Sequence, residues 1–203
     1  YTVTSTSGSK RINKISIMQL SKDGQKVIGS KINIDCDCLG MSGGWTPAVH
    51  LFTQSGGKLK FRDEDQVFIP NIYPSDQLSI GSCNGDLNLD EILLNTPRSL
   101  KEFLNIKNTD YDNLEVLSAS NKSKRNIWLL PSDKILGKTK SFVDYQNDAT
   151  AKDIKLALRE GFRSIEHVKR YTTTGMGTDQ GKLGNMHALG IISETAGTKM
   201  GEH

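Results

Sequence analysis

The sequence predicts an α/β fold over residues 1–105 and a small all-helical module over residues 127–203, joined by a linker over 106–126. Short stretches with alternating apolar residues, separated by glycine-containing turns, predict strands in the first part. Capping residues, helical apolar spacing and closing glycines predict the helices of the second part. The linker is polar, rich in Asn, Ser, Lys and Asp, and shows little periodicity.

The strands of the first part are expected at recurring apolar residues. Residues 12–20 form the first strand, and the chain returns from Val27 after the turn 22–24, whose Asp-Gly pair is typical of a β-hairpin. The return leads to a strand at residue 34 that ends in a glycine-rich turn. Further short strands are expected at residues 65–70 and 77–81.

Two helices are expected at the end of the first part. One covers about residues 88–94. A second begins at Thr96 as N-cap, with Pro97 in its first turn, and extends to Leu104, because proline is favoured at a first helical position.

The helical module has clearer local signals. Thr150 and Asp153 form a capping box, in which the two side chains bond each other's exposed amides, and the helix that they open stops at Gly161. Ser164 caps a second helix. A third covers residues 186–196.

Composition excludes several classes of function. There are 26 basic and 23 acidic residues, which is too balanced for binding nucleic acid or an anionic membrane by bulk charge. No apolar run is long enough for a membrane span. The three cysteines do not form a disulfide pattern, so we expect a reduced, cytoplasmic protein.

Two glycine-rich turns could hold a dinucleotide. The first contains Gly43 and Gly44; the second contains Gly81, Ser82, Asn84 and Gly85 and is followed by a helix. A strand, a glycine turn and a helix N-terminus together let backbone amides approach a pyrophosphate or ribose. The alternative is two ordinary tight turns, since a Gly-x-Gly-x-x-Gly motif is absent.

The cysteines offer a weaker metal hypothesis. Cys36 and Cys38 would share one face of a strand, and Cys83 and His50 could complete a ligand set. Buried strand cysteines are more often small hydrophobic residues, and we favour that interpretation. No metal site is therefore expected.

A polar loop after the second helix could bind phosphate. Lys169, Arg170, Thr172 and Thr173 supply two cations and two hydroxyl groups, followed by several glycines. Alternatively, the two cations complement the dipole of a solvated helix end. A DNA-reading helix–turn–helix over 151–171 is disfavoured by the acidic residues among its few cations. No catalytic nucleophile or carboxylate pair is visible, so any chemistry belongs to a cofactor.

Residues 34–51, with Ser-Gly-Gly-Trp-Thr-Pro at 42–47, and residues 142–154, 160–173 and 175–181 resemble the alpha subunits of heterotetrameric sarcosine oxidase. The resemblance implies that residues 1–105 are the later part of a disulfide-reductase-like dinucleotide domain that binds NAD. The Gly-x-Gly-x-x-Gly turn of that domain would lie upstream. The turn at 81–85, with Leu87 and Leu89 after it, would contact the cofactor.

Residues 140–184 also resemble the small helical modules of bacterioferritin-associated ferredoxin. In that family four cysteines bind a [2Fe–2S] cluster. The matching positions here hold Asp144, Gln146, Asp179 and Gly184. The resemblance therefore implies a ferredoxin-like scaffold without an iron–sulfur cluster.

The sarcosine oxidase family implies an accessory role. Sarcosine would be oxidised at an FAD on the beta subunit, and electrons would pass to an FMN at the alpha–beta interface, near Lys169–Gln180. The partners would be the beta, gamma and delta subunits. The chain starts at Tyr1 without methionine, so we expect a piece of a longer alpha subunit that is inactive alone.

Two other functions stay open from the sequence. A dye-linked proline, opine or glycine dehydrogenase subunit shares this architecture but usually keeps the cluster cysteines. A non-enzymatic docking module is the other alternative.

Overall fold

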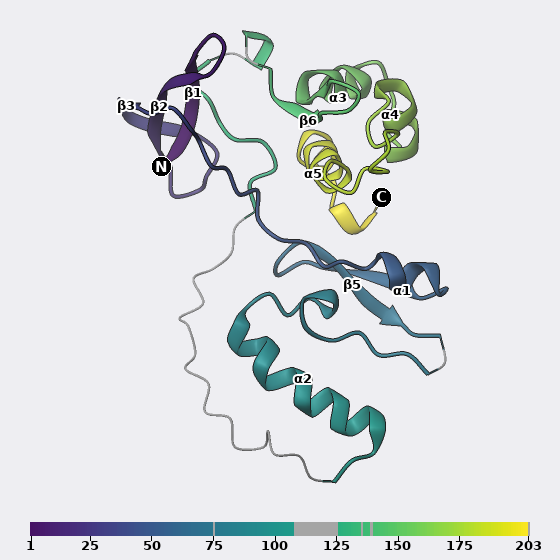
Figure 1. Cartoon of the computed structure of the whole chain (residues 1–203). Helices are drawn as coiled ribbons and strands as arrows, with labels where there is room; N and C mark the ends of the chain where they lie inside the picture. The colour runs from purple at the N-terminus through teal and green to yellow at the C-terminus, as the bar shows by residue number, and fades with distance from the viewer. Residues whose placement is uncertain (75, 108–125, 135, 139, 203) are drawn as a thin grey trace. The chain divides into compact units, whose positions relative to one another are not determined.

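The computed structural model describes residues 1–74, 76–107, 126–134, 136–138 and 140–202 (Figure 1). It divides into two compact units, one formed by Tyr1–Met41 with Ile127–His203 and the other by Ser42–Asn126. The expected boundaries at 105 and 127 separate domains defined by sequence character and family resemblance, whereas this division follows compactness. The boundaries therefore stay a prediction. Most of the expected linker lies outside the described residues.

The first unit begins with a three-stranded antiparallel sheet in the order β1-β2-β3. Strand β2 (Ile12–Leu20) and strand β3 (Val27–Asp35) form the predicted hairpin, and the amide of Gln25 donates to Oδ1 of Asp23 in its turn. Strand β1 (Thr2–Gly8) was not predicted, because its threonines and serines lack an apolar alternation. Backbone hydrogen bonds to β2 stabilise this strand, although its side chains show no apolar pattern.

The second unit contains a β-hairpin, and one predicted strand is wrong. Strands β4 (Lys58–Arg62) and β5 (Val67–Ile72) are antiparallel; β5 overlaps the expected 65–70, whereas lysine-rich β4 was missed. The residues expected as a strand at 77–81 are irregular and lead into the 3-10 turn η1 (Gly81–Asn84). A short helix, α1 (His50–Gln54), precedes the hairpin.

The two helices expected over 88–104 are one helix, α2 (Leu89–Leu104). Thr96 is therefore not an N-cap, and Pro97 lies inside the helix, where it removes one backbone hydrogen bond. The helix begins after Asn88 and ends at Asn105, which adopts a left-handed conformation. Proline was misread as a start because it is favoured in the first turn of a helix and is rare in a helix interior.

The helices of the module lie where the sequence predicts them, although the module is not all-helical. Ser164 occupies the N-cap position of α4, but its side chain makes no capping hydrogen bond, so that part of the prediction is wrong. A small hairpin of β6 (Phe142–Asp144) and β7 (Ala149–Thr150) precedes the helices. The capping box at Thr150 and Asp153 is confirmed in both directions. The remaining elements are η2 (Leu136–Lys138), α3 (Ala151–Arg159), α4 (Ile165–Thr172), α5 (Asn185–Ala196) and η3 (Met200–Glu202).

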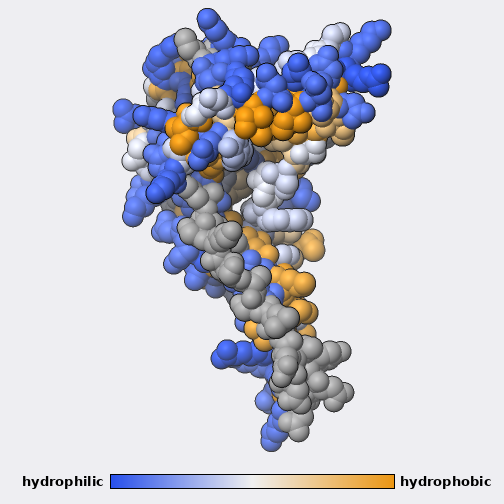
Figure 2. All heavy atoms as spheres, turned by 90° about the vertical axis from the view of Figure 1, so that its left-hand side faces the viewer, coloured by the Kyte–Doolittle hydropathy of each residue, from blue (hydrophilic) through white to orange (hydrophobic). Residues whose placement is uncertain are grey.

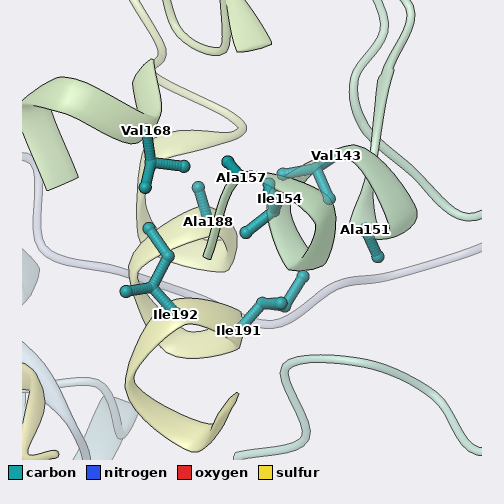
Figure 3. Packing of buried hydrophobic residues seen from close by; sticks show 8 residues of the cluster. All are labelled: Val143, Ala151, Ile154, Ala157, Val168, Ala188, Ile191 and Ile192. Carbon is teal, nitrogen blue, oxygen red and sulfur yellow. The ribbon is translucent and has the colours of Figure 1, made fainter. Parts of the chain in front are cut away.

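The core of the module lies among α3, α4 and α5 (Figure 3). Ile154 and Ile192 are fully buried, and Val168 points toward them from α4. Burying each such side chain stabilises the fold by about 1.5–3 kcal/mol. Partly buried Trp128 packs at the edge, where its ring occupies the space that a Cβ of Gly190 would need. By fixing α3, α4 and α5 against one another, this core fixes the ends of the loops that connect these helices.

None of the described helices has the length and apolar character needed to cross a membrane.

Candidate functional site

Two loops of the helical module meet at one buried carboxylate. Oδ1 of Asp144 accepts hydrogen bonds from the amides of Gln146, at 2.8 Å, and Asn147, at 3.1 Å. Its Oδ2 accepts from the amide of Gly175 at 2.7 Å and from the Asn147 side chain at 3.3 Å. Asp144 is only 6% exposed. The carboxylate therefore joins the β6–β7 turn to the loop after α4.

Gln146 makes a second connection between the same loops. Its Oε1 accepts from the hydroxyl of Thr178 at 2.9 Å and from the amide of Asp179 at 3.4 Å. Asn147 adds a third, because its side-chain amide donates to the carbonyl of Thr173 at 3.1 Å. Neither Asn147 nor Thr178 is among the candidate site residues that the sequence predicts.

The structure brings together the positions that the sequence resemblance aligns with the cysteines of ferredoxin-like modules. Asp144, Gln146 and Asp179 belong to one hydrogen-bond network. Gly184 lies against the same strand, since a Cβ built there would be 2.7 Å from the carbonyl oxygen of Val143. We call Asp144, Gln146, Asp179 and Gly184 with their hydrogen-bond partners the loop network.

Glycines let these loops approach one another closely. Gly175 and Gly181 have positive φ values of 73° and 75°, and a Cβ at either would be 2.1 Å from Oδ1 of Asn185. A Cβ at Gly177 would be 2.2 Å from Oε1 of Gln146. A Cβ at any of the three would force the side chain of Asn185 or Gln146 to move, and the positive φ of Gly175 and Gly181 also favours glycine at those two positions.

Asn185 lies at the start of α5 beneath these glycines. Its Nδ2 donates to the carbonyl of Gln180 at 3.3 Å. Its Oδ1 is buried and accepts no hydrogen bond among the residues described. The sequence did not single out Asn185, since a lone asparagine before a helix resembles any other capping residue.

Hydrogen bonds keep Asp144 ionised. Burial favours the neutral form, but the bonds from Gly175, Asn147 and Gln146 outweigh it, and the pKa of Asp144 lies below its ordinary value. Because all of its hydrogen-bond partners are amide donors, the carboxylate is stabilised as an anion and has a structural role. It has no free oxygen with which to bind a metal cation.

The residues predicted to hold a phosphate lie just beyond this network. Lys169 and Arg170 are in the last turn of α4, and Lys169 pairs with Glu166 at 3.7 Å. The Thr172 hydroxyl donates to the carbonyl of Val168 at 2.7 Å. The Thr173 hydroxyl also bonds locally, to the carbonyl of Thr172. This arrangement is that of a helix C-terminus, whose dipole disfavours an added anion.

The residues of the first predicted cofactor turn do not form a closed cradle. Gly43 and Gly44 are exposed in an irregular segment, and a Cβ at either would meet no atom within 4 Å. Gly44 has a positive φ of 95°, which is the one conformational reason for glycine there.

The second predicted turn is held firmly. Arg62 donates from Nη2 to the carbonyl of Gly85 at 2.7 Å and bonds Asp65 with two nitrogens. The hydrogen bond to Asp65 raises the pKa of the Arg62 guanidinium, which stays charged. Asn84 accepts from the Tyr73 hydroxyl at 3.3 Å. Sequence reasoning missed Arg62, since its contact with the predicted turn joins residues 23 positions apart.

The surroundings of this turn are acidic. Gly81 and Gly85 have positive φ values of 63° and 90°, and Ser82 is exposed. The first turn of α2 carries Asp90 and Glu91, which repel a phosphate at that helix N-terminus. Leu87 is half-buried, whereas Leu89 is 71% exposed.

The cysteines are free: Cys38 and Cys83 are exposed and Cys36 is partly buried. In the described part of the chain, no three His, Cys, Asp or Glu side chains gather as metal ligands would.

Comparison with solved structures identifies the class of fold. The structure of L-proline dehydrogenase from P. horikoshii matches with a TM-score of 0.55 and 18% sequence identity, over 98% of this chain and 40% of that chain. The chain thus has a mixed α/β fold that also occurs in a dehydrogenase.

Sequence comparisons are more specific. Residues 138–203 match the sarcosine oxidase A3 domain. Sarcosine oxidase subunit alpha of Rhizobium meliloti (strain 1021) is 33% identical over 179 residues, which are 86% of this chain and 18% of the relative. The subunit alpha of Corynebacterium sp. (strain P-1) is 28% identical over 203 residues, 96% of this chain and 20% of the relative.

Over most of its length the chain is therefore similar to sarcosine oxidase alpha subunits, and residues 138–203 match the A3 domain of that family. It spans about a fifth of the length of the curated relatives that it matches.

Proposed function

We propose that this chain is a scaffold segment of the alpha subunit of a flavin-dependent amine oxidoreductase that oxidises sarcosine. The names of the relatives support the substrate and the multi-subunit assembly. In this proposal the catalytic oxidation takes place on another subunit. This segment contributes to NAD binding and to the surface on which the FMN and the beta subunit dock.

The loop network is the observation that carries the proposal. A related electron-transfer module would hold a cluster with four thiolates at these positions. Here the loops are instead connected through Asp144 and Gln146, with no sulfur ligand. The module keeps its loop arrangement by hydrogen bonds, so its role is to present a surface rather than to relay electrons through iron.

The rim of the loop network suits protein contact. Tyr145, Met176 and Leu183 flank network residues in sequence and are 74%, 49% and 71% exposed. Large apolar side chains on rigid loops make good interface anchors, because little conformational entropy is lost on binding. We assign this rim to contact with the beta subunit; the gamma and delta subunits would complete the complex.

The Gly81–Gly85 turn is the part of the chain that best suits NAD. The Arg62 contact fixes the turn, and the acidic residues around it favour a ligand with hydroxyl donors over a phosphate. We therefore propose that Gly81, Ser82, Asn84 and Gly85, with Leu87 and Leu89, contact a ribose of NAD. The backbone of Gly43 and Gly44, in an irregular segment, would also approach the NAD molecule.

The FMN assignment rests on the family alone. Lys169, Arg170, Thr172 and Thr173 do not form a phosphate cradle by themselves, since one cation is paired and the hydroxyls bond locally. Arg170 is exposed and is the side chain best able to reach a phosphate brought by a partner.

The test uses the assembled complex of full-length subunits. We expect sarcosine-dependent oxygen uptake, bound FAD and FMN, and neither iron nor acid-labile sulfide. Lys169→Ala with Arg170→Ala should lower the FMN content of the complex, measured after release of the flavin. The control Lys152→Ala removes an exposed cation from α3 and should leave FMN unchanged.

Two outcomes would redirect the proposal. Stoichiometric iron and sulfide would favour a dye-linked proline, opine or glycine dehydrogenase subunit, as would oxidation of those substrates rather than sarcosine. An assembled complex without bound flavin or amine-dependent turnover would leave a docking module with no part in an enzyme.

A further inference from the structure

Helix α2 has an apolar face whose side chains stay partly exposed among the described residues. The helix buries none of its residues. Five of its large apolar side chains lie within about 100° of one another around the axis, given a helical period of about 3.6 residues. These residues are Leu89, Leu93, Leu100, Phe103 and Leu104, which are 71%, 40%, 37%, 46% and 55% exposed. We call them the α2 face.

The α2 face is a property of the helix rather than of scattered residues. The other side of α2 carries polar residues such as Asn95, Arg98 and Glu102. Figure 2 shows hydrophobic side chains reaching the surface at the height of α2. Apolar patches of this kind mark interaction surfaces in folded proteins.

The described residues support the helix only in part, since it contacts η1 but buries none of its residues. Pro97 removes an internal hydrogen bond, and the Asn88 side chain does not cap the first turn. A helix of 16 residues is marginal alone in water and is normally stabilised by packing of its apolar face.

We propose that the α2 face packs against an apolar surface contributed by further residues of the same alpha-subunit polypeptide. The matched alpha subunits are about five times as long as this chain, and the match to one of them covers 96% of this chain. The proline dehydrogenase chain of the same fold is also longer, since this chain covers 40% of it. This inference rests on the family and not on the proposed cofactor roles.

A second copy of the chain is a poorer occupant. A 16-residue helix is about 24 Å long, and one such helix face offers less than the roughly 800 Å² per partner that stable dimers bury. Packing within one polypeptide avoids the entropic cost of association, so a small face is sufficient.

The experiment compares two leucine substitutions in the full-length alpha subunit. Leu100→Asp places a charge on the α2 face. Leu94→Asp is the matched control, because Leu94 is 53% exposed and lies about 100° around the helix from Leu93, outside the face. Hydrogen exchange of the α2 amides and the mass of the protein in solution are measured for each.

In the wild-type subunit without partners, we expect α2 amides to be protected by at least the order of 100-fold, independently of protein concentration. Leu100→Asp should remove most of this protection, and Leu94→Asp should retain it. Unprotected α2 amides in the wild type would overturn the proposal. So would protection that depends on protein concentration, which indicates a second copy, or that requires a partner subunit.

Discussion

The amide of Gly175 donates a 2.7 Å hydrogen bond to Oδ2 of Asp144, across a separation of 31 positions in the chain. This bond and its neighbours join the β6–β7 turn to the loop that follows α4. The positions of these two loops therefore depend on the Asp144 carboxylate.

Asp144→Asn should destabilise the protein. The amide group presents an NH₂ where an oxygen now accepts, so at least one backbone donor loses its partner. We expect a loss of about 1.5–3 kcal/mol in the free energy of unfolding, measured with urea. Asp148→Asn is the control, because Asp148 is exposed and its left-handed φ of 53° suits asparagine. Equal losses for the two substitutions would show that the hydrogen bonds accepted by the Asp144 carboxylate do not stabilise the fold.

Stability should fall in acid through the same group. The pKa of Asp144 is lowered in the folded state by its hydrogen bonds, against the effect of burial. The stabilisation is therefore complete above the ordinary pKa of 3.8 and is lost as the pH falls through the lower, folded pKa. The free energies of unfolding of wild type and Asp144→Asn should converge between about pH 6 and about pH 2. A constant difference over that range would contradict the assignment.

Gly175→Ala should be more costly than a conformational penalty alone. Gly175 has a φ of 73°, and its added Cβ would collide with Oδ1 of Asn185. Gly197 has a similar φ of 69° but open space around it, so Gly197→Ala measures the backbone strain alone. We expect the free energy of unfolding to fall by about 1–3 kcal/mol more for Gly175→Ala, as in other overpacked sites. Equal losses would mean that Asn185 moves away freely.

Gly190→Ala should displace Trp128. A Cβ at Gly190 would be 2.1 Å from the indole ring. The protein has two tryptophans, and Trp45 is 82% exposed, so the background variant Trp45→Phe leaves Trp128 as the only indole. In that background we expect red-shifted fluorescence and a loss of about 1–3 kcal/mol in the free energy of unfolding. Unchanged emission would show that the ring does not pack on α5.

Local signals predicted the elements that depend on local physics. The capping box at Thr150 and the hairpin turn at Asp23 involve residues a few positions apart, and both are found. Strand β1 was missed because its threonines and serines show no apolar alternation. Strand β4 was missed although Leu59 and Phe61 alternate with its basic residues, because the alternation is only five residues long. Pro97 was assigned to a helix start, whereas the helix continues through it.

The candidate site was predictable in outline only. The resemblance to ferredoxin-like modules predicted Asp144, Gln146, Asp179 and Gly184 as the positions aligned with four cysteines. It gave no means to find Asn147 or Asn185, because their partners come from loops that only the folded core brings together. Arg62 was missed for the same reason, since its contact with Gly85 spans two separate elements.

The most direct test of the account is hydrogen exchange at the Gly175 amide before and after exhaustive treatment with a metal chelator. Hydrogen bonds to Asp144 hold the loop, so we expect this amide to be protected equally in both samples and to lose protection in Asp144→Asn. An amide that exchanges freely in the wild type, or that becomes unprotected on chelation, would show that something other than the carboxylate holds the loops together.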